Sequence, residues 1–146
     1  METSQEYQVD LNWQENQNAK LSALVFNNAI ELAPSSCLQK LNGDVWSAEH
    51  LFIASIESSY MTSFFRTAKN KRIKFKSFKS TARASFLISD EFSEITDIVI
   101  RPVVTISERN QINRTLKLFS VCKEHCLVVK ALKVRLHLFP SVRVEE

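Results

Sequence analysis

Residues 47–69 read SAEHLFIASIESSYMTSFFRTAK, and this stretch decides the fold. Its first residue is a serine, which can cap a helix, and Glu49 follows in the first turn, where a carboxylate favours the helix dipole. In the middle of the stretch only Glu57 and Tyr60 carry ionisable groups. A helix with apolar or small side chains on all sides is normally buried. We therefore predict a central core helix from Ser47 to about Lys69.

Three short strands are predicted before this helix. Residues 7–13 alternate between apolar and polar, which is the period of a half-buried strand. Residues 21–26 and 29–32 have strand character on either side of Asn27-Asn28, and asparagine tolerates the backbone geometry of a tight hairpin. Residues 34–44 are expected to form a loop.

Two longer strands are predicted after the helix, at residues 72–86 and 93–107. The second becomes rich in β-branched residues but contains Pro102. Because proline cannot donate a hydrogen bond to a sheet, we expect an edge position or a bulge there.

A second helix is predicted over residues 108–123, with Ser107 as its cap and an apolar stripe of Ile112, Leu116 and Phe119. A short helix at 126–132 and a closing strand within 133–144 follow. Runs of strands joined as hairpins, without strict alternation of strand and helix, indicate the α+β class. The length of 146 residues fits a single domain spanning residues 1–146.

Composition excludes several classes of function. Gly43 is the single glycine, so neither a P-loop nor a dinucleotide-binding loop can form. The three histidines lie too far apart for a metal-ligand motif, and the three cysteines do not form a disulfide framework. No signal peptide or membrane-spanning stretch is visible, and the net charge is only +3. We expect a cytoplasmic protein with reduced thiols, no cofactor and no membrane association.

Two segments carry a family resemblance. The first is residues 43–52, GDVWSAEHLF, which lead into residues 58–62, SSYMT. The second is residues 125–133, HCLVVKALK, followed by residues 136–138, LHL. In this order and spacing they resemble the OsmC family of peroxiredoxin-like proteins, which includes the organic hydroperoxide resistance proteins. The resemblance implies bent antiparallel sheets packed on a long buried central helix, assembled as an intertwined homodimer.

The resemblance also implies a chemistry. In the family a peroxidatic cysteine attacks a hydroperoxide, a second cysteine resolves the sulfenic acid as a disulfide, and a dithiol reductant restores both thiols. Carried over, Glu49 matches a glutamate that orients an assisting arginine, and Cys126 matches the resolving cysteine. Ser59 stands where the peroxidatic cysteine belongs. The N-terminal region has no arginine at the expected place, and Lys20 lacks the planar guanidinium that would substitute for it.

The exchange of sulfur for oxygen has a direct consequence. A thiol has a pKa of about 8.5 and can be tuned to neutral pH, whereas a serine hydroxyl cannot be ionised there and forms no sulfenic acid. We therefore expect a relative of the thiol-dependent hydroperoxide reductases of the oxidative stress response whose own peroxidase activity is lost or reduced. An alternative is non-catalytic binding of a small apolar or thiol ligand, such as an organic hydroperoxide, in a pocket at the dimer interface.

Other residues leave further alternatives open. Cys122 or Cys37 could take over a redox role, although two cysteines four residues apart on one helix are poorly placed for a disulfide unless the helix breaks between them. Glu57 could be a buried acid or base, or a hydrogen-bonded carboxylate at an interface. A serine hydrolase built on Ser59 is disfavoured, because His50 lies about 13 Å away along the helix axis.

Eight basic residues without an intervening acid form a strip from Arg66 to Arg83, with Phe75 and Phe78 among them. Such a strip could bind nucleic acid or an acidic partner, with phenylalanines stacking on bases. The solvated face of a strand, in which lysines prevent edge-to-edge aggregation, explains the same pattern. We favour the solvated face and do not expect a nucleic acid partner.

Overall fold

The computed structural model describes residues 2–33 and 45–146. The chain divides into two compact units, residues 1–52 and residues 53–146. The predicted loop at 34–44, and Cys37 within it, lie outside the described residues. Within the described ranges no helix has both the length and the apolar character needed to cross a bilayer.

The first unit contains an antiparallel sheet in the order β1 (Asp10–Asn12), β2 (Ala19–Ser22) and β3 (Ile30–Leu32). The three predicted strands and the hairpin around Asn27-Asn28 are confirmed, but each strand is shorter than predicted. The expected strand end at residues 24–26 is instead part of a turn, in which the Phe26 amide donates to the Ala23 carbonyl at 3.0 Å.

The predicted helix is α1 (Ala48–Asn70), the longest helix among the described residues. Ser47 caps it, because the His50 amide donates to the Ser47 hydroxyl at 3.2 Å. Burial is one-sided within the chain, in contrast to the prediction. The fully buried side chains form one stripe, while Met61 and Phe65 are 36% and 42% exposed. The buried stripe consists of Ile56, Tyr60, Ser63, Phe64 and Ala68.

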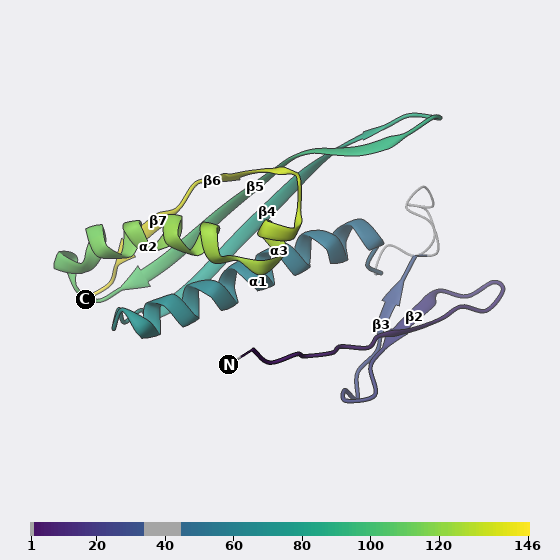
Figure 1. Ribbon diagram of the computed structural model, residues 1–146, viewed down its shortest axis with the longest axis horizontal. Helices are drawn as coiled ribbons and strands as arrows, with labels where there is room; N and C mark the ends of the chain where they lie inside the picture. Colours follow the sequence, from purple (N-terminus) through teal and green to yellow (C-terminus); the bar gives the residue numbers. More distant parts are fainter. Residues whose placement is uncertain (1, 34–44) are drawn as a thin grey trace. The chain divides into compact units, whose positions relative to one another are not determined.

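The second unit is built on the long antiparallel hairpin of β4 (Ser77–Ile88) and β5 (Ser93–Ile106) (Figure 1). The prediction of one closing strand is wrong. The chain forms β6 (Arg135–Leu138) and β7 (Ser141–Val144), which both pair with β5 in the parallel direction. The helices after β5 return the chain to the start of that strand, so the last strands run parallel to it.

Pro102 lies in the middle of β5, so the prediction of an edge position or a bulge there is wrong. The irregularity in the hairpin lies instead between Ser85 and Phe86. β6 pairs with β5 as far as Ile100, and β7 pairs with it from Val103 onward. Pro102 therefore lies opposite the gap between β6 and β7, where a missing donor breaks no ladder on that side of the strand.

The helices after β5 are η1 (Arg109–Gln111), α2 (Ile112–His125) and α3 (Leu127–Ala131). The second helix and the short third helix are confirmed. The prediction that Ser107 is a cap is wrong, because the residues before η1 and α2 are Glu108 and Gln111 and neither side chain caps. The predicted stripe is also shifted, since Leu116 is 39% exposed. The buried residues of α2 are Thr115, Leu118, Phe119 and Cys122.

The core lies between α1, α2 and the inner face of the β4–β5 hairpin, along which both helices run (Figure 1). The Phe64 ring lies within 5.2 to 5.4 Å of three aromatic rings, measured between centroids. These belong to Phe75, Phe78 and Phe119. Two side chains of α1 also bond to the backbone of α2. The Tyr60 hydroxyl donates to the Phe119 carbonyl at 2.9 Å, and the Ser63 hydroxyl donates to the Cys122 carbonyl at 3.3 Å.

We predict that Tyr60→Phe lowers the free energy of unfolding by about 1 kcal/mol, because a buried hydrogen bond between α1 and α2 is lost while the ring packing stays. Urea denaturation followed by circular dichroism measures this. Tyr7→Phe is the matched control, since Tyr7 is 85% exposed and bonds only to Gln5. Equal stability of the Tyr60 variant and the natural protein would show that this bond does not hold the helices together.

Candidate functional site

Ser59 and Cys126, which lie 67 residues apart in sequence, meet in the structure. The Cys126 thiol donates a hydrogen bond to the Ser59 hydroxyl oxygen, with 3.1 Å between sulfur and oxygen. Ser59 is half-buried on α1, and Cys126 is fully buried. The Val128 amide also approaches the same oxygen at 3.5 Å. The two residues matched to the family's cysteine pair are therefore direct neighbours.

Chain geometry places Cys126 at the junction of two helices. α2 ends at His125, and Cys126 has extended backbone angles before α3 begins at Leu127. Its carbonyl accepts the Lys130 amide at 3.0 Å, which closes the first turn of α3. The helix therefore breaks between Cys122 and Cys126, as a disulfide between them would require, yet both thiols are free in the structure.

Cys122 lies behind this pair, in the interior. Burial raises the pKa of the Cys122 thiol, and the nearby Cys126 adds to this. Hydrogen bonds with Thr67 and Ser63 act in the opposite direction but are smaller. Burial also raises the pKa of Tyr60 far above its usual range, with both cysteines contributing. Raised pKa values keep these groups neutral, which is the opposite of what thiolate chemistry requires.

Glu49 lies ten residues before Ser59 on the same helix. Among the described residues, its carboxylate takes part in no hydrogen bond or ion pair. The side chain that does interact in this first turn is His50, whose Nδ1 lies 2.6 Å from the Ser47 hydroxyl. Lys20 is exposed on β2. The structure thus joins Ser59 to Cys126, whereas Glu49 and Lys20 belong to the first unit of the chain.

The pair at Ser59 lacks the groups that activate a nucleophile. Within the described part of the chain, no lysine, arginine or histidine makes a hydrogen bond or ion pair with Ser59 or Cys126. No group of three potential metal-ligating side chains is found there either. The arrangement places a thiol next to a hydroxyl, but among the described residues it supplies neither a base for Ser59 nor a cation for Cys126.

One carboxylate oxygen of Glu57 is buried without a hydrogen-bond partner among the described residues. This atom is Oε1, and the Ser80 hydroxyl on β4 is in the same situation. Both alternatives for Glu57, a buried acid or base and an interface carboxylate, therefore stay predictions.

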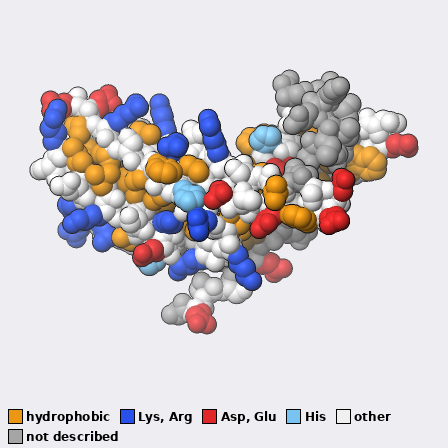
Figure 2. Space-filling view, turned by 90° about the horizontal axis from the view of Figure 1, so that it is seen from above, with side chains coloured by type: hydrophobic (Ala, Val, Ile, Leu, Met, Phe, Trp, Pro, Cys, Tyr) orange, Lys and Arg blue, Asp and Glu red, His pale blue; other side chains and the backbone are white. Residues whose placement is uncertain are grey.

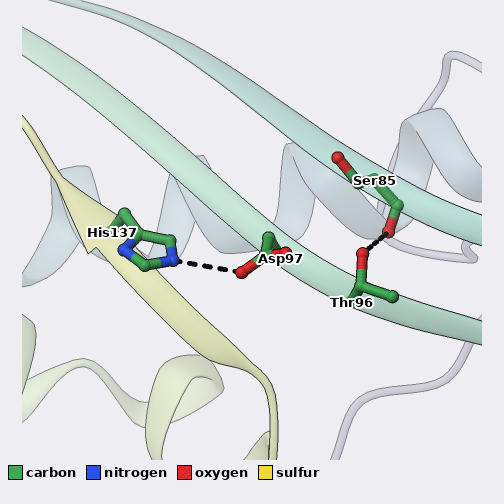
Figure 3. Close-up of polar contacts among 4 residues, drawn as sticks. All are labelled: Ser85, Thr96, Asp97 and His137. Atoms are coloured by element: carbon green, nitrogen blue, oxygen red, sulfur yellow. Dashed lines mark hydrogen bonds and ion pairs between the residues drawn. The ribbon is translucent and has the colours of Figure 1, made fainter.

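A histidine–carboxylate contact lies outside the predicted site. His137 of β6 and Asp97 of β5 approach to 3.1 Å between Nε2 and Oδ1, on the side of the sheet where Ser85 of β4 also lies (Figure 3). Thr96 bonds to the Ser85 carbonyl beside it. Sequence reasoning missed this pair because the parallel pairing of β6 with β5, which brings it together, was not anticipated.

The basic strip from Arg66 to Arg83 is exposed at each of its charged positions. Its two phenylalanines, however, point into the core. The Phe75 ring lies 5.2 Å from that of Phe65, and the Phe78 ring lies 5.3 Å from that of Phe64. Both rings are engaged with other aromatic side chains, which weakens the feature that most favoured a nucleic acid interface in this strip.

Comparisons with known proteins agree with this fold. A family model described as OsmC-like protein matches residues 41–138, so the chain belongs to the OsmC family. No curated protein matches it.

Solved structures share the fold at low identity. An OsmC-like protein of Vibrio cholerae superposes with a TM-score of 0.79 at 16% identity, covering 94% of this chain and 99% of that chain. The organic hydroperoxide resistance protein OsmC of Legionella pneumophila gives 0.70 at 14% identity, with coverage of 97% and 100%. OhrB of Bacillus subtilis gives 0.68 at 12% identity, with coverage of 92% and 98%. The long helix and the sheets of the α+β class are therefore those of the OsmC fold.

The raised pKa of Cys122 predicts a loss of stability in alkaline solution. The unfolded chain ionises this thiol from its ordinary pKa of 9.0, whereas the folded protein holds it neutral to higher pH. Stability is therefore fully present below pH 9.0 and falls as the pH rises above it. Urea denaturation across this range measures the slope.

Cys122→Val, which keeps an apolar side chain of similar size, should make this decline shallower but not abolish it, because Tyr60 adds a decline of the same sign at still higher pH. Cys126→Val, which replaces a second buried thiol by the same apolar side chain, is the comparison. An identical pH dependence in the natural protein and the Cys122 variant would contradict the prediction.

Proposed function

We propose that this chain is an OsmC family protein related to thiol-dependent organic hydroperoxide reductases that does not itself carry out their two-cysteine reaction. The observation that carries this proposal is the 3.1 Å contact between the Cys126 sulfur and the Ser59 oxygen. It preserves the adjacency that a peroxidatic and a resolving cysteine need, but an oxygen occupies the position of one sulfur.

The chemistry at this contact supports a loss of peroxidase activity. A sulfenic acid and then a disulfide must form between two sulfurs, and Ser59 can form neither. Cys126 retains its sulfur, yet it is fully buried and its proton is directed toward Ser59. A buried thiol with no neighbouring cation reacts slowly with peroxides. The site therefore retains the shape of the family's reaction centre without its nucleophile.

The first experiment compares the natural protein with Ser59→Cys for reduction of an organic hydroperoxide by a dithiol. We expect the natural protein to show only the slow background of buried thiols and Ser59→Cys to gain turnover, because its new thiol lies beside Cys126. Ser58→Cys is the matched control. The Ser58 hydroxyl bonds to the Ala54 carbonyl of its own helix and has no contact with Cys126.

Mass spectrometry of the same variants separates the steps. After peroxide treatment, Ser59→Cys should contain a disulfide between positions 59 and 126. Ser59→Cys combined with Cys126→Ser should stop at the sulfenic acid. Rapid turnover by the natural protein would overturn the proposal. An inactive Ser59→Cys variant that forms neither the sulfenic acid nor the disulfide would mean that the missing arginine matters too, and ligand binding would become the better account.

We also propose that the protein is a homodimer in which the sheet of residues 1–52 packs against a second copy. Within the described part of this unit, Ala19 is the one buried apolar residue. The alternating side chains of the first strand region, Tyr7, Val9, Leu11 and Trp13, are each more than half exposed. A three-stranded sheet without a covered apolar face is not stable on its own, so another surface has to cover it.

Charge favours a second copy as that surface. Residues 1–52 carry 2 Lys and Arg against 7 Asp and Glu, whereas residues 53–146 carry 17 against 9. The formal charges are −5 and +8, so the first unit of one chain attracts the second unit of another. The exposed Met61 and Phe65 of α1 supply apolar surface for such a contact.

Leu11→Glu should weaken the dimer by at least about tenfold, because it places a charge on the apolar face of β1. Analytical ultracentrifugation over a concentration series measures the dissociation constant. Asn12→Glu adds the same charge on the opposite face of the same strand and should have a much smaller effect. A natural protein that is monomeric at all concentrations would refute the dimer.

A further inference from the structure

The outer face of the β4–β5–β6–β7 sheet is strongly cationic. The inner face is occupied by buried residues such as Ile98, Ile100 and Val104. Strand register places the alternate side chains on the opposite face, and the basic ones there are all exposed. They are Lys79 and Arg83 of β4, Arg101 of β5, Arg135 of β6 and Arg143 of β7.

Few acids offset these charges. Asp97 lies on the same face but is engaged with His137, and Glu94 is opposite Leu87 near the end of the hairpin. Figure 2 shows blue side chains spread over the left of the view, with few red ones among them. A free anion is therefore attracted to this part of the surface before any specific contact forms.

One end of this face is hollowed into a groove of about 290 Å³. Its floor is β5, and β4 and β7 form its sides. Ser77, Thr105 and Arg143 lie in one row across the three strands, and Lys79 and Val103 lie in the next row. Given strand spacings, the Cα atoms of Lys79 and Arg143 are roughly 12 Å apart. Both side chains are long enough to reach a group bound over Thr105.

The polar groups of this groove are unused. Among the described residues, the hydroxyls of Ser77 and Thr105, the Lys79 ammonium and the Arg143 guanidinium have no hydrogen-bond or ion-pair partner. The backbone around them is held firmly. The Glu145 amide donates to the Ile106 carbonyl at 2.9 Å, and the Lys76 ammonium donates to the Glu145 carbonyl at 2.9 Å. Two cations and two hydroxyls, none of which has a partner among the described residues, therefore lie together on a strand surface whose backbone is held by hydrogen bonds.

We propose that this groove binds the phosphate group of a small organic phosphate. The arginine fork can hold two phosphate oxygens, the lysine supplies a second charge, and the hydroxyls of Ser77 and Thr105 can donate to the remaining oxygens. A carboxylate has only two oxygens and would leave part of this donor set unused. The groove is at the small end of ligand sites, which suits a compact molecule.

Two neighbouring features refine the specificity. Glu145 also lines the groove, so its carboxylate opposes anion binding and limits the affinity. The aromatic rings in this region are already engaged, because Phe75 and Phe78 pack against the Phe64 ring and the Arg101 guanidinium lies 4.7 Å from the centroid of the Phe139 ring. A small phosphate ester fits these features better than a nucleic acid strand does.

Binding is tested with the full chain at low ionic strength, with glycerol 3-phosphate and inorganic phosphate as probes. Titration calorimetry gives the dissociation constant, and amide chemical shifts locate the contact. We expect saturable binding, with shifts centred on Lys79, Thr105 and Arg143. The double variant Lys79→Gln, Arg143→Gln should weaken binding by at least about tenfold. Glu145→Gln should strengthen it by about two- to fivefold, because a repulsive charge is removed.

The matched control is Arg83→Gln, Arg135→Gln, which removes the same charge from the same sheet face but outside the groove. It should change the affinity by no more than about twofold. Absence of saturable binding, or equal losses in the two double variants, would overturn the proposal.

A single-stranded oligonucleotide could also bind more tightly than the phosphate probes, with the two double variants weakening its binding equally. That result would overturn the proposal and indicate a diffuse surface for polyanions. Ser59→Cys should bind the probes as the natural protein does. Failure of this proposal is therefore distinguishable from failure of the proposed function.

Discussion

The attachment of α1 to α2 is the constraint on which the rest of the second unit depends. Apolar contact alone would allow the two helices to slide along each other, because side-chain packing tolerates many similar arrangements. The Tyr60 and Ser63 hydroxyls restrict this freedom, since each must reach one particular carbonyl of α2. The rings around Phe64 then fix the distance of both helices from β4.

The candidate site is a direct consequence of this attachment. Ser59 is adjacent to Tyr60 and one turn before Ser63, so its position relative to α2 is fixed by the same two bonds. Cys126 follows α2 immediately, and the extended backbone at that residue turns its thiol back toward α1. Ser59 and Cys126 can therefore be held at contact distance by neighbouring residues that do not touch both of them.

Sequence reasoning could predict what depends on local pattern and failed where long-range pairing decided the outcome. The helix cap at Ser47 and the order of elements follow from short motifs, and the contact between Ser59 and Cys126 was anticipated only through the family resemblance. The last strand is split at Phe139-Pro140, and both parts pair with β5 in the parallel direction. This pairing joins residues that are distant in sequence, so no local pattern reports it. The tolerance of Pro102 depends in turn on that split, so one missed pairing produced both errors.

The same limit applies to the basic residues. Along the chain, Arg66 to Arg83 form an uninterrupted run, but α1, a turn and β4 carry its members in different directions. Cross-strand register instead groups Lys79 with Arg143, which is 64 residues later. Charge density in a sequence therefore indicates that a cationic surface exists, whereas the pairing of strands decides which cations can share one ligand. The contact between Ser59 and Cys126 involves α1 and the residue after α2, whereas the cationic groove is lined by β4, β5 and β7, so the two features are built from different elements of the second unit.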